Sequence, residues 1–123
     1  IKPLLSHIKQ GQMGYYLPDD DCGAEHTVFV AFFATYKLTL PVLNNMVNIA
    51  KAVGIPMFPR YNAKSRKYEM EIRPPMQLSD DPEQSARAMN EEIEYFVTPT
   101  PEQYVWILQL LRTRKDGEDI YPD

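Results

Sequence analysis

The segment LSDDPEQSARAMNEEIEYFV, residues 78–97, has the pattern of a long capped helix. Asp80 or Asp81 can cap its start, and Pro82 suits the first turn because an N–H there would lack a helical partner. The apolar residues of the stretch then recur at a helical spacing along one face, at Ala86, Met89, Ile93 and Phe96. The pattern predicts an amphipathic helix that buries this face.

Two shorter helices are expected earlier in the chain. Residues 1–10 have apolar side chains at a helical spacing, and Gly11 is placed to end that helix. A second helix begins at Pro41 with Thr39 as its cap, and Gly54 ends it. Its apolar face consists of Leu43, Met46, Val47, Ala50 and Val53.

Four segments have strand character. Residues 13–17 (MGYYL) are typical of a short buried strand, and residues 27–33 (TVFVAFF) fit either a strand or an apolar loop. Residues 55–61 (IPMFPRY) are apolar and bounded by turns, but two prolines make them an awkward central strand. Residues 67–72 (KYEMEI) alternate, which predicts a half-exposed strand with Tyr68, Met70 and Ile72 on one face.

The segment TPEQYVWILQLLRTR, residues 100–114, predicts a last helix. Thr100 would cap it, Pro101 would take the first position, and Gln103 could return a hydrogen bond as in a capping box. Its apolar stripe would be Tyr104, Ile107, Leu108 and Leu111. The resulting order of helices and strands predicts an α/β fold whose sheet can carry an antiparallel edge. No strand precedes the first one, so we expect an incomplete sheet.

Composition restricts the class of protein. The 123 residues suffice for one domain, and 13 basic and 17 acidic residues give a net charge of −4. That balance argues against bulk nucleic-acid binding. The basic residues nevertheless cluster twice, and such patches can attract a phosphorylated or acidic partner. The clusters are Lys64, Arg66 and Lys67, and then Arg112, Arg114 and Lys115.

Cysteine content and hydropathy give further expectations. Cys22 is the one cysteine, which excludes a disulfide framework within the chain and fits a reducing compartment. We expect Cys22 to be a passive small residue. The sequence has no run of about 18 apolar residues that would encode a membrane-spanning helix. Because the chain starts at Ile1 within a helical pattern, we expect a piece of a longer protein.

Known catalytic motifs are missing from the sequence. It has no P-loop, dinucleotide turn, zinc-ligand spacing or nucleophile elbow. The two histidines are His7, which we expect at the surface of a charged helix, and His26, which we expect to shape a loop. Five positions after them stand Gln12 and Ala31, so neither begins a His-x-x-x-x-Asp/Glu pair.

The aspartate run in YYLPDDDCG has two interpretations. Three acids in a turn are usually solvated, and Asp20 fits that reading. A carboxylate of Asp19 or Asp21 that turned inward, beside apolar strands, would need a cation or donor to offset its desolvation. The available cations are Lys37, Arg60 and Arg73. The cluster at residues 112–115 likewise either stabilises the end of a helix or docks an anionic partner.

Several segments together resemble a known family. They are GYYLPDDDCGAEHTVFVAFFATYKLTLP, IPMFPRY, EIRPPM, ARAMNEEIEYFV and TPEQYVWILQLLRTRKDGE. In order and content they resemble the C-terminal part of the late acyltransferases of bacterial lipid A biosynthesis, most of all the branch that transfers myristoyl chains. The resemblance implies a fold related to the glycerolphosphate acyltransferases. It implies acyl transfer from acyl carrier protein or acyl-CoA to a hydroxyacyl chain of the Kdo-bearing lipid A precursor, without metal or cofactor.

The resemblance also assigns roles to residues. Related acyltransferases have a Phe-Pro-Glu-Gly-Thr-Arg-like block that holds the phosphorylated acceptor, and Asp19 would take the place of its Glu. Asp21 would stand where a polar side chain is expected. The Arg of that block is absent, so Lys37 or Arg60 would supply the positive charge. Independently of the resemblance, the charge of Arg112, Arg114 and Lys115 makes them the candidates to bind a partner.

The resemblance places the chemistry outside this chain. The family's His-x-x-x-x-Asp/Glu motif and its membrane anchor lie upstream of the matched region in the sequence. The family works at the cytoplasmic face of the bacterial inner membrane. We therefore expect no catalytic residue in this chain and no activity of the chain alone. The alternatives are a non-catalytic module that binds acyl carrier protein or an anionic lipid, and a truncated chain without independent function.

Overall fold

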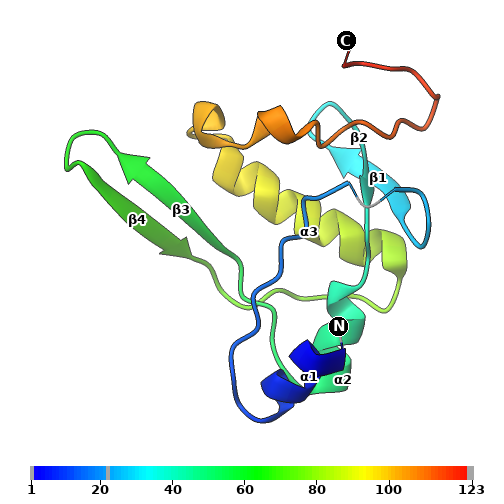
Figure 1. Cartoon of the computed structure of the whole chain (residues 1–123), viewed down its shortest axis with the longest axis vertical. Coiled ribbons are helices and arrows are strands. Elements are labelled where there is room, and N and C mark those ends of the chain that lie inside the picture. Colours follow the sequence, from blue (N-terminus) through cyan, green and yellow to red (C-terminus); the bar gives the residue numbers. More distant parts are fainter. Residues whose placement is uncertain (1, 22, 122–123) are drawn as a thin grey trace.

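A long helix runs through the middle of the fold. The structure, a computed structural model, describes residues 2–21 and 23–121, and α3 (Pro82–Val97) is this helix (Figure 1). The Asp81 side chain caps it by accepting a hydrogen bond from the Gln84 N–H at 2.8 Å. The predicted apolar face is confirmed, because Ala86, Met89 and Phe96 are buried and Ile93 packs against the core. The prediction for Cys22 lies outside the described residues.

An antiparallel hairpin packs on α3. It consists of β1 (Val28–Phe32) and β2 (Thr35–Thr39), which confirms the strand interpretation of residues 27–33. The sequence TYKLT did not predict β2, since its polar side chains interrupt any apolar run. Lys37 and Thr39 are nevertheless fully buried in the structure.

A buried asparagine joins the hairpin to the helix. The Asn90 side chain in α3 donates a hydrogen bond to the Ala31 carbonyl at 3.1 Å, and the Thr39 hydroxyl donates to the Asn90 side-chain oxygen at 3.3 Å. These bonds satisfy polar groups that would be costly to bury alone. The prediction that Thr39 caps a helix is therefore wrong, because Thr39 ends β2 and faces the core.

Two short helices lie together at the end of the molecule away from β1 and β2 (Figure 1). They are α1 (Lys2–Lys9) and α2 (Leu43–Ala50), and both were predicted. The second helix stops earlier than Gly54, because Lys51 already adopts a left-handed conformation with φ 52°. That residue ends the helical hydrogen-bond ladder before the glycine is reached.

The second hairpin projects from the body of the molecule (Figure 1). It pairs β3 (Met57–Asn62) with β4 (Lys67–Ile72) in antiparallel register, so both predicted strands are confirmed. The predicted burial of one β4 face is wrong, because Tyr68, Met70 and Ile72 are all exposed.

Two further predictions of secondary structure fail. Residues 13–17 form no strand and pair with no strand of the described residues, and Met13, Tyr15 and Leu17 are exposed. Residues 100–114 form no α-helix. The segment has two single 3₁₀ turns, η1 (Pro101–Gln103) and η2 (Trp106–Leu108), and continues after them through turns and irregular chain.

The last segment departs from an α-helix because its side chains find distant partners. Thr100 makes no capping hydrogen bond, and the Gln103 amide bonds the N–H and carbonyl of Tyr61 at 2.8 and 3.0 Å. Tyr104 and Leu110 are buried in the core beside Phe32. Ile107 and Leu108 of the predicted apolar stripe are exposed instead.

The α/β class is therefore correct in coarse form. Among the described residues, the strands form two separate two-stranded antiparallel sheets around three helices. A single sheet flanked by helices is not observed. The glycerolphosphate-acyltransferase relationship and the incompleteness of the sheet stay predictions.

Candidate functional site

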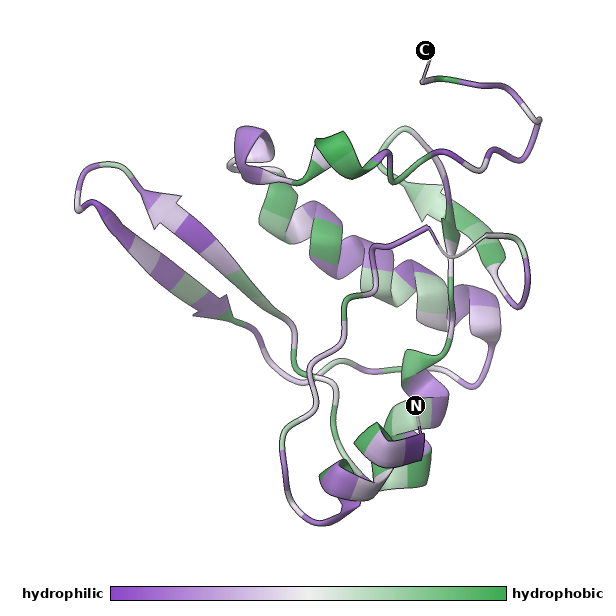
Figure 2. Cartoon of the chain, viewed as in Figure 1, coloured by the Kyte–Doolittle hydropathy of each residue, from purple (hydrophilic) through white to green (hydrophobic). Residues whose placement is uncertain are grey.

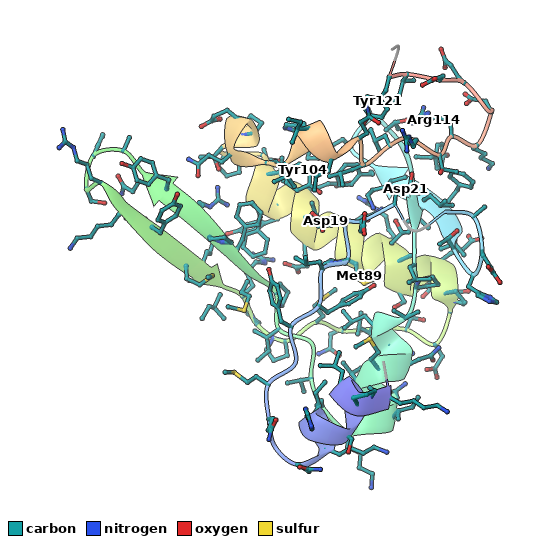
Figure 3. The ribbon with its side chains drawn as sticks, in the orientation of Figure 1. Asp19, Asp21, Met89, Tyr104, Arg114 and Tyr121 are labelled. Carbon is teal, nitrogen blue, oxygen red and sulfur yellow. The ribbon has the colours of Figure 1, made fainter. Side chains whose placement is uncertain are left out.

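The aspartate loop meets the last segment of the chain. The Tyr104 hydroxyl donates a hydrogen bond to Asp19 Oδ2 at 3.1 Å, across 85 positions of sequence. Burial raises the pKa of Tyr104 far above its ordinary value, and the negative charge of Asp19 raises it further. Tyr104 is therefore a neutral donor, and Asp19 fixes the residue that anchors this segment in the core (Figure 3).

Asp21 holds the same segment further along. Its carboxylate accepts from the Thr113 N–H at 2.9 Å and from the Thr113 hydroxyl at 3.1 Å. It also accepts from the Gly23 N–H at 3.0 Å, which closes the loop locally. Asp20, between the two, is exposed. The solvated interpretation is thus correct for Asp20, whereas Asp19 and Asp21 are both partly buried and bound to donors.

Arg60 and Arg73, two of the cations available to pair with these carboxylates, bind other residues instead. Arg60 donates to the Thr100 hydroxyl at 2.8 Å and pairs with Glu71 at 3.3 Å, at the second hairpin. Arg73 pairs with Glu92 at 2.6 Å. The expectation that Arg60 supplies the positive charge at Asp19 is therefore not met.

Lys37 is a buried lysine of the first hairpin. Its side chain is fully buried, and its Nζ atom lies 3.4 Å from the Leu38 carbonyl oxygen. The neighbouring residue, Tyr36, contacts the basic segment, because its carbonyl accepts from Arg114 at 3.3 Å and its ring lies 5.4 Å from the Lys115 ammonium. The aspartate loop, β2 and residues 104–115 therefore converge.

An open cavity of about 590 Å³ lies at this convergence. It is lined by Gln109, Arg112, Thr113, Arg114, Gly117, Glu118, Asp119 and Tyr121. Figure 3 places Asp21, Arg114 and Tyr121 in the same part of the molecule. Asp21 therefore fixes Thr113, which is part of the cavity wall.

The cavity offers cationic donors to an anion. Arg112 is exposed, and the Nε atom of Arg114 is buried without a hydrogen-bond partner among the described residues. A guanidinium presents several donors in a plane that suits carboxylate and phosphate groups. Glu118 and Asp119 also line the cavity and partly offset this charge. Arg112 and Arg114 of the predicted cluster line the cavity, and the cluster lies on an irregular segment and not at the end of an α-helix. Its role in binding a partner stays a prediction.

The histidines and the possible metal ligands form no further site in the described part of the chain. His7 is exposed on α1, and His26 is an exposed loop residue 3.4 Å from the exposed Glu25. Residues 2–21 and 23–121 contain no group of three or more His, Cys, Asp or Glu placed to hold a metal ion. None of the helices in those ranges is long and apolar enough to cross a membrane.

Two residues of this arrangement were missed by the sequence analysis. Tyr104 was assigned to a helical stripe and Thr113 had no role, yet both bind the aspartate loop. A tyrosine on a mostly apolar segment does carry a signal, because a buried hydroxyl usually finds a polar partner. No local signal marked Thr113.

Comparisons with known proteins agree with the resemblance. The model of the bacterial lipid A biosynthesis acyltransferase family matches residues 1–113. A lipid A biosynthesis acyltransferase of Haemophilus influenzae is 77% identical over 121 residues, which are 98% of this chain and 38% of that protein. The lipid A biosynthesis myristoyltransferase of Escherichia coli K12 is 50% identical over 99% of this chain and 41% of its own length. The lauroyltransferase of the same organism is 30% identical over 95% of this chain and 39% of its own length. No solved structure matches the chain significantly.

The fold and site define a mixed α/β chain in which two loop carboxylates hold a basic segment beside an open cavity. This chain belongs to the bacterial lipid A biosynthesis acyltransferase family. It spans about two fifths of the length of the curated relatives described above.

Proposed function

We propose that the chain is the C-terminal part of an enzyme that transfers a myristoyl group from acyl carrier protein to a hydroxyacyl chain of the Kdo-bearing lipid A precursor. The observation that carries the proposal is the graded similarity to named relatives. Identity is 50% with the myristoyltransferase and 30% with the lauroyltransferase, over nearly the same share of this chain. The proposal places the enzyme at the cytoplasmic face of the bacterial inner membrane.

The chain's own contribution is to bind and orient. Arg112, Arg114 and Lys115 dock an anionic group of acyl carrier protein, and the open cavity gives that group a place to enter. Asp19 and Asp21 are positioning residues, because they hold the segment that carries these cations. The buried Lys37 lies on the strand that this segment contacts, which supports a role in the same region.

The chemical step belongs to the part of the enzyme outside this chain. A histidine of an upstream His-x-x-x-x-Asp/Glu pair takes the proton of the acceptor hydroxyl, and the acid orients that histidine. The hydroxyl oxygen then attacks the acyl thioester carbonyl, and the carrier thiolate leaves. Neither histidine of this chain begins such a pair.

An acyl-transfer assay tests the proposal. Radiolabelled myristoyl carrier protein and lipid A precursor are incubated with the purified chain or with the full-length protein that contains it. We expect turnover by the full-length protein and none above background by the chain. Turnover by the isolated chain would show that the chemistry has been assigned to the wrong part.

The upstream sequence separates this function from the rival one. A non-catalytic module that binds acyl carrier protein or anionic lipid would have no His-x-x-x-x-Asp/Glu pair upstream. We expect that pair within about a hundred residues before Ile1, behind an apolar N-terminal segment. An upstream region with neither feature would overturn the proposal.

A further inference from the structure

The projecting hairpin has one face made of apolar residues. The directly opposed pairs are Met57 with Ile72, Pro59 with Met70, and Tyr61 with Tyr68. Directly opposed residues of antiparallel strands point to the same face of a sheet. The rings of Tyr61 and Tyr68 lie 5.3 Å apart, as this arrangement requires. We call these six residues the apolar hairpin face.

This face is open, whereas the opposite face of the hairpin packs on the body of the protein. The exposed fractions are 46% for Met57, 42% for Tyr61, 79% for Tyr68, 52% for Met70 and 64% for Ile72. At about 200 Å² for each large side chain, they expose roughly 570 Å², which is near the upper limit for a monomer. Figure 2 shows the alternation of polar and apolar residues along β4.

The opposite face explains the orientation of the hairpin. Phe58 stacks on Phe96 of α3 at a ring distance of 5.2 Å. Glu71 accepts a hydrogen bond from the Tyr95 hydroxyl at 2.8 Å, and Arg60 binds Thr100. The hairpin thus uses its more polar face for internal contacts and presents its apolar face outward.

Three cations stand at the tip of the same hairpin. Lys64, Arg66 and Lys67 are exposed, and none of them forms an ion pair with a residue in the described part of the chain. They are concentrated at one end of a projecting element, in a chain whose net charge is −4. Basic residues beside an exposed apolar and tyrosine-bearing surface suit an anionic lipid surface, where tyrosine favours the headgroup level.

The β3 edge of the hairpin is closed to another strand. The Gln103 side chain already bonds the outward N–H and carbonyl of Tyr61. Outward-facing positions recur every second residue, so the next one along β3 is Pro59, which has no N–H to donate. A second copy of this chain is therefore blocked from extending the ladder at Tyr61 and Pro59 of the β3 edge, whereas the apolar hairpin face stays open for docking.

We propose that the apolar hairpin face and its cationic tip lie on the surface of an anionic lipid bilayer. The face enters the headgroup region, and Lys64, Arg66 and Lys67 contact lipid phosphates. This contact is separate from acyl transfer. A failure of bilayer binding would leave the proposed function untouched, and the activity assay does not test bilayer binding.

Vesicle co-sedimentation of the 123-residue chain tests the proposal. We expect binding to vesicles of phosphatidylcholine with 30% phosphatidylglycerol, much weaker binding to pure phosphatidylcholine, and release by 0.5 M salt. Replacement of Lys64, Arg66 and Lys67 by Gln should lower the partition coefficient by about a hundredfold. The matched control replaces Lys2, Lys9 and Lys51 by Gln, which changes the net charge equally and should have a much smaller effect.

A second pair of variants tests the apolar face. Tyr68→Ser combined with Met70→Ser should weaken binding by about tenfold, because apolar area is no longer removed from water. Met13→Ser combined with Ile107→Ser alters apolar residues that are even more exposed but lie away from the hairpin, and it should leave binding nearly unchanged. Equal effects of test and control variants, or no binding to anionic vesicles, would overturn the proposal.

Protease protection of the unmodified chain gives an answer that does not depend on how any variant folds. Trypsin cleaves after Lys64, Arg66 and Lys67, and also after Lys9 and Lys51. Anionic vesicles should protect the first group and leave the second accessible. Self-association without vesicles, abolished by the Tyr68 and Met70 changes, would assign the face to a second copy instead.

Discussion

The clearest test of the aspartate loop is a substitution at Asp21, because the Asp21 carboxylate joins residues that are far apart in the chain. Asp21→Asn preserves the size of the side chain, but it replaces one acceptor oxygen by an NH₂ donor. In one amide orientation that donor faces the Thr113 N–H, and in the other it faces the Gly23 N–H. At least one hydrogen bond from a backbone N–H to the carboxylate is therefore lost in either case.

The magnitude follows from the kind of bond. A hydrogen bond to a charged group contributes about 1.5–3 kcal/mol, so Asp21→Asn should lower the free energy of unfolding by about 2 kcal/mol. For a chain of this length that corresponds to a fall of roughly 8 °C in Tm. Asp20→Asn is the control, because an exposed substitution typically changes stability by less than about 0.5 kcal/mol.

Two measurements on the isolated chain check this reasoning. Thermal or urea unfolding gives the stability difference between the two variants. Amide hydrogen exchange at Thr113 should be about thirtyfold faster in Asp21→Asn, since about 2 kcal/mol of protection is lost. Equal stabilities for Asp20→Asn and Asp21→Asn, with unchanged exchange at Thr113, would refute the inference that Asp21 holds the last segment.

Two other predictions concern carboxylates. The Glu94 carboxylate accepts hydrogen bonds from Arg87 at 2.6 and 3.0 Å and from the Phe33 N–H at 2.7 Å. The bonds from Arg87 lower the pKa of Glu94, although burial acts in the opposite direction, and the bond from Phe33 lowers this pKa further. A lowered folded-state pKa means that the ionised group stabilises the fold above its unfolded pKa and loses this effect as pH falls through the folded value. Glu94→Gln should therefore be less stable than the unmodified chain at pH 7, and its stability should fall less on acidification. Urea unfolding at several pH values measures both, and parallel pH profiles of the two proteins would contradict the prediction. In the full-length enzyme, Asp19→Asn should lower kcat/KM by about ten- to a hundredfold at matched thermal stability, because the Tyr104 anchor of the basic segment is weakened. If it has no more effect than Asp20→Asn, Asp19 does not act on the site.

Several elements could be predicted because their signals are local. The cap at Asp81 and the spacing of Ala86 and Met89 require knowledge of one helical turn at a time, and both are confirmed. The alternation in residues 67–72 likewise gave β4, since the period of a strand is two residues. The basic and acidic residues of the site were also visible in the sequence as clusters.

Tertiary contacts decided the conformation of the last segment and the partners of the loop aspartates. Residues 100–114 have a helix start signal, yet Gln103 bonds Tyr61 across 42 positions, Tyr104 bonds Asp19 across 85, and Thr113 bonds Asp21 across 92. Local propensity contributes only tenths of a kcal/mol per residue, so a few bonds and buried side chains from distant segments outweigh it. Sequence alone therefore determined the central helix and the alternation of residues along β4, whereas the structure decided which face of β4 is exposed. Which donors the loop aspartates hold was decided only by folding, because their partners lie far away in the chain.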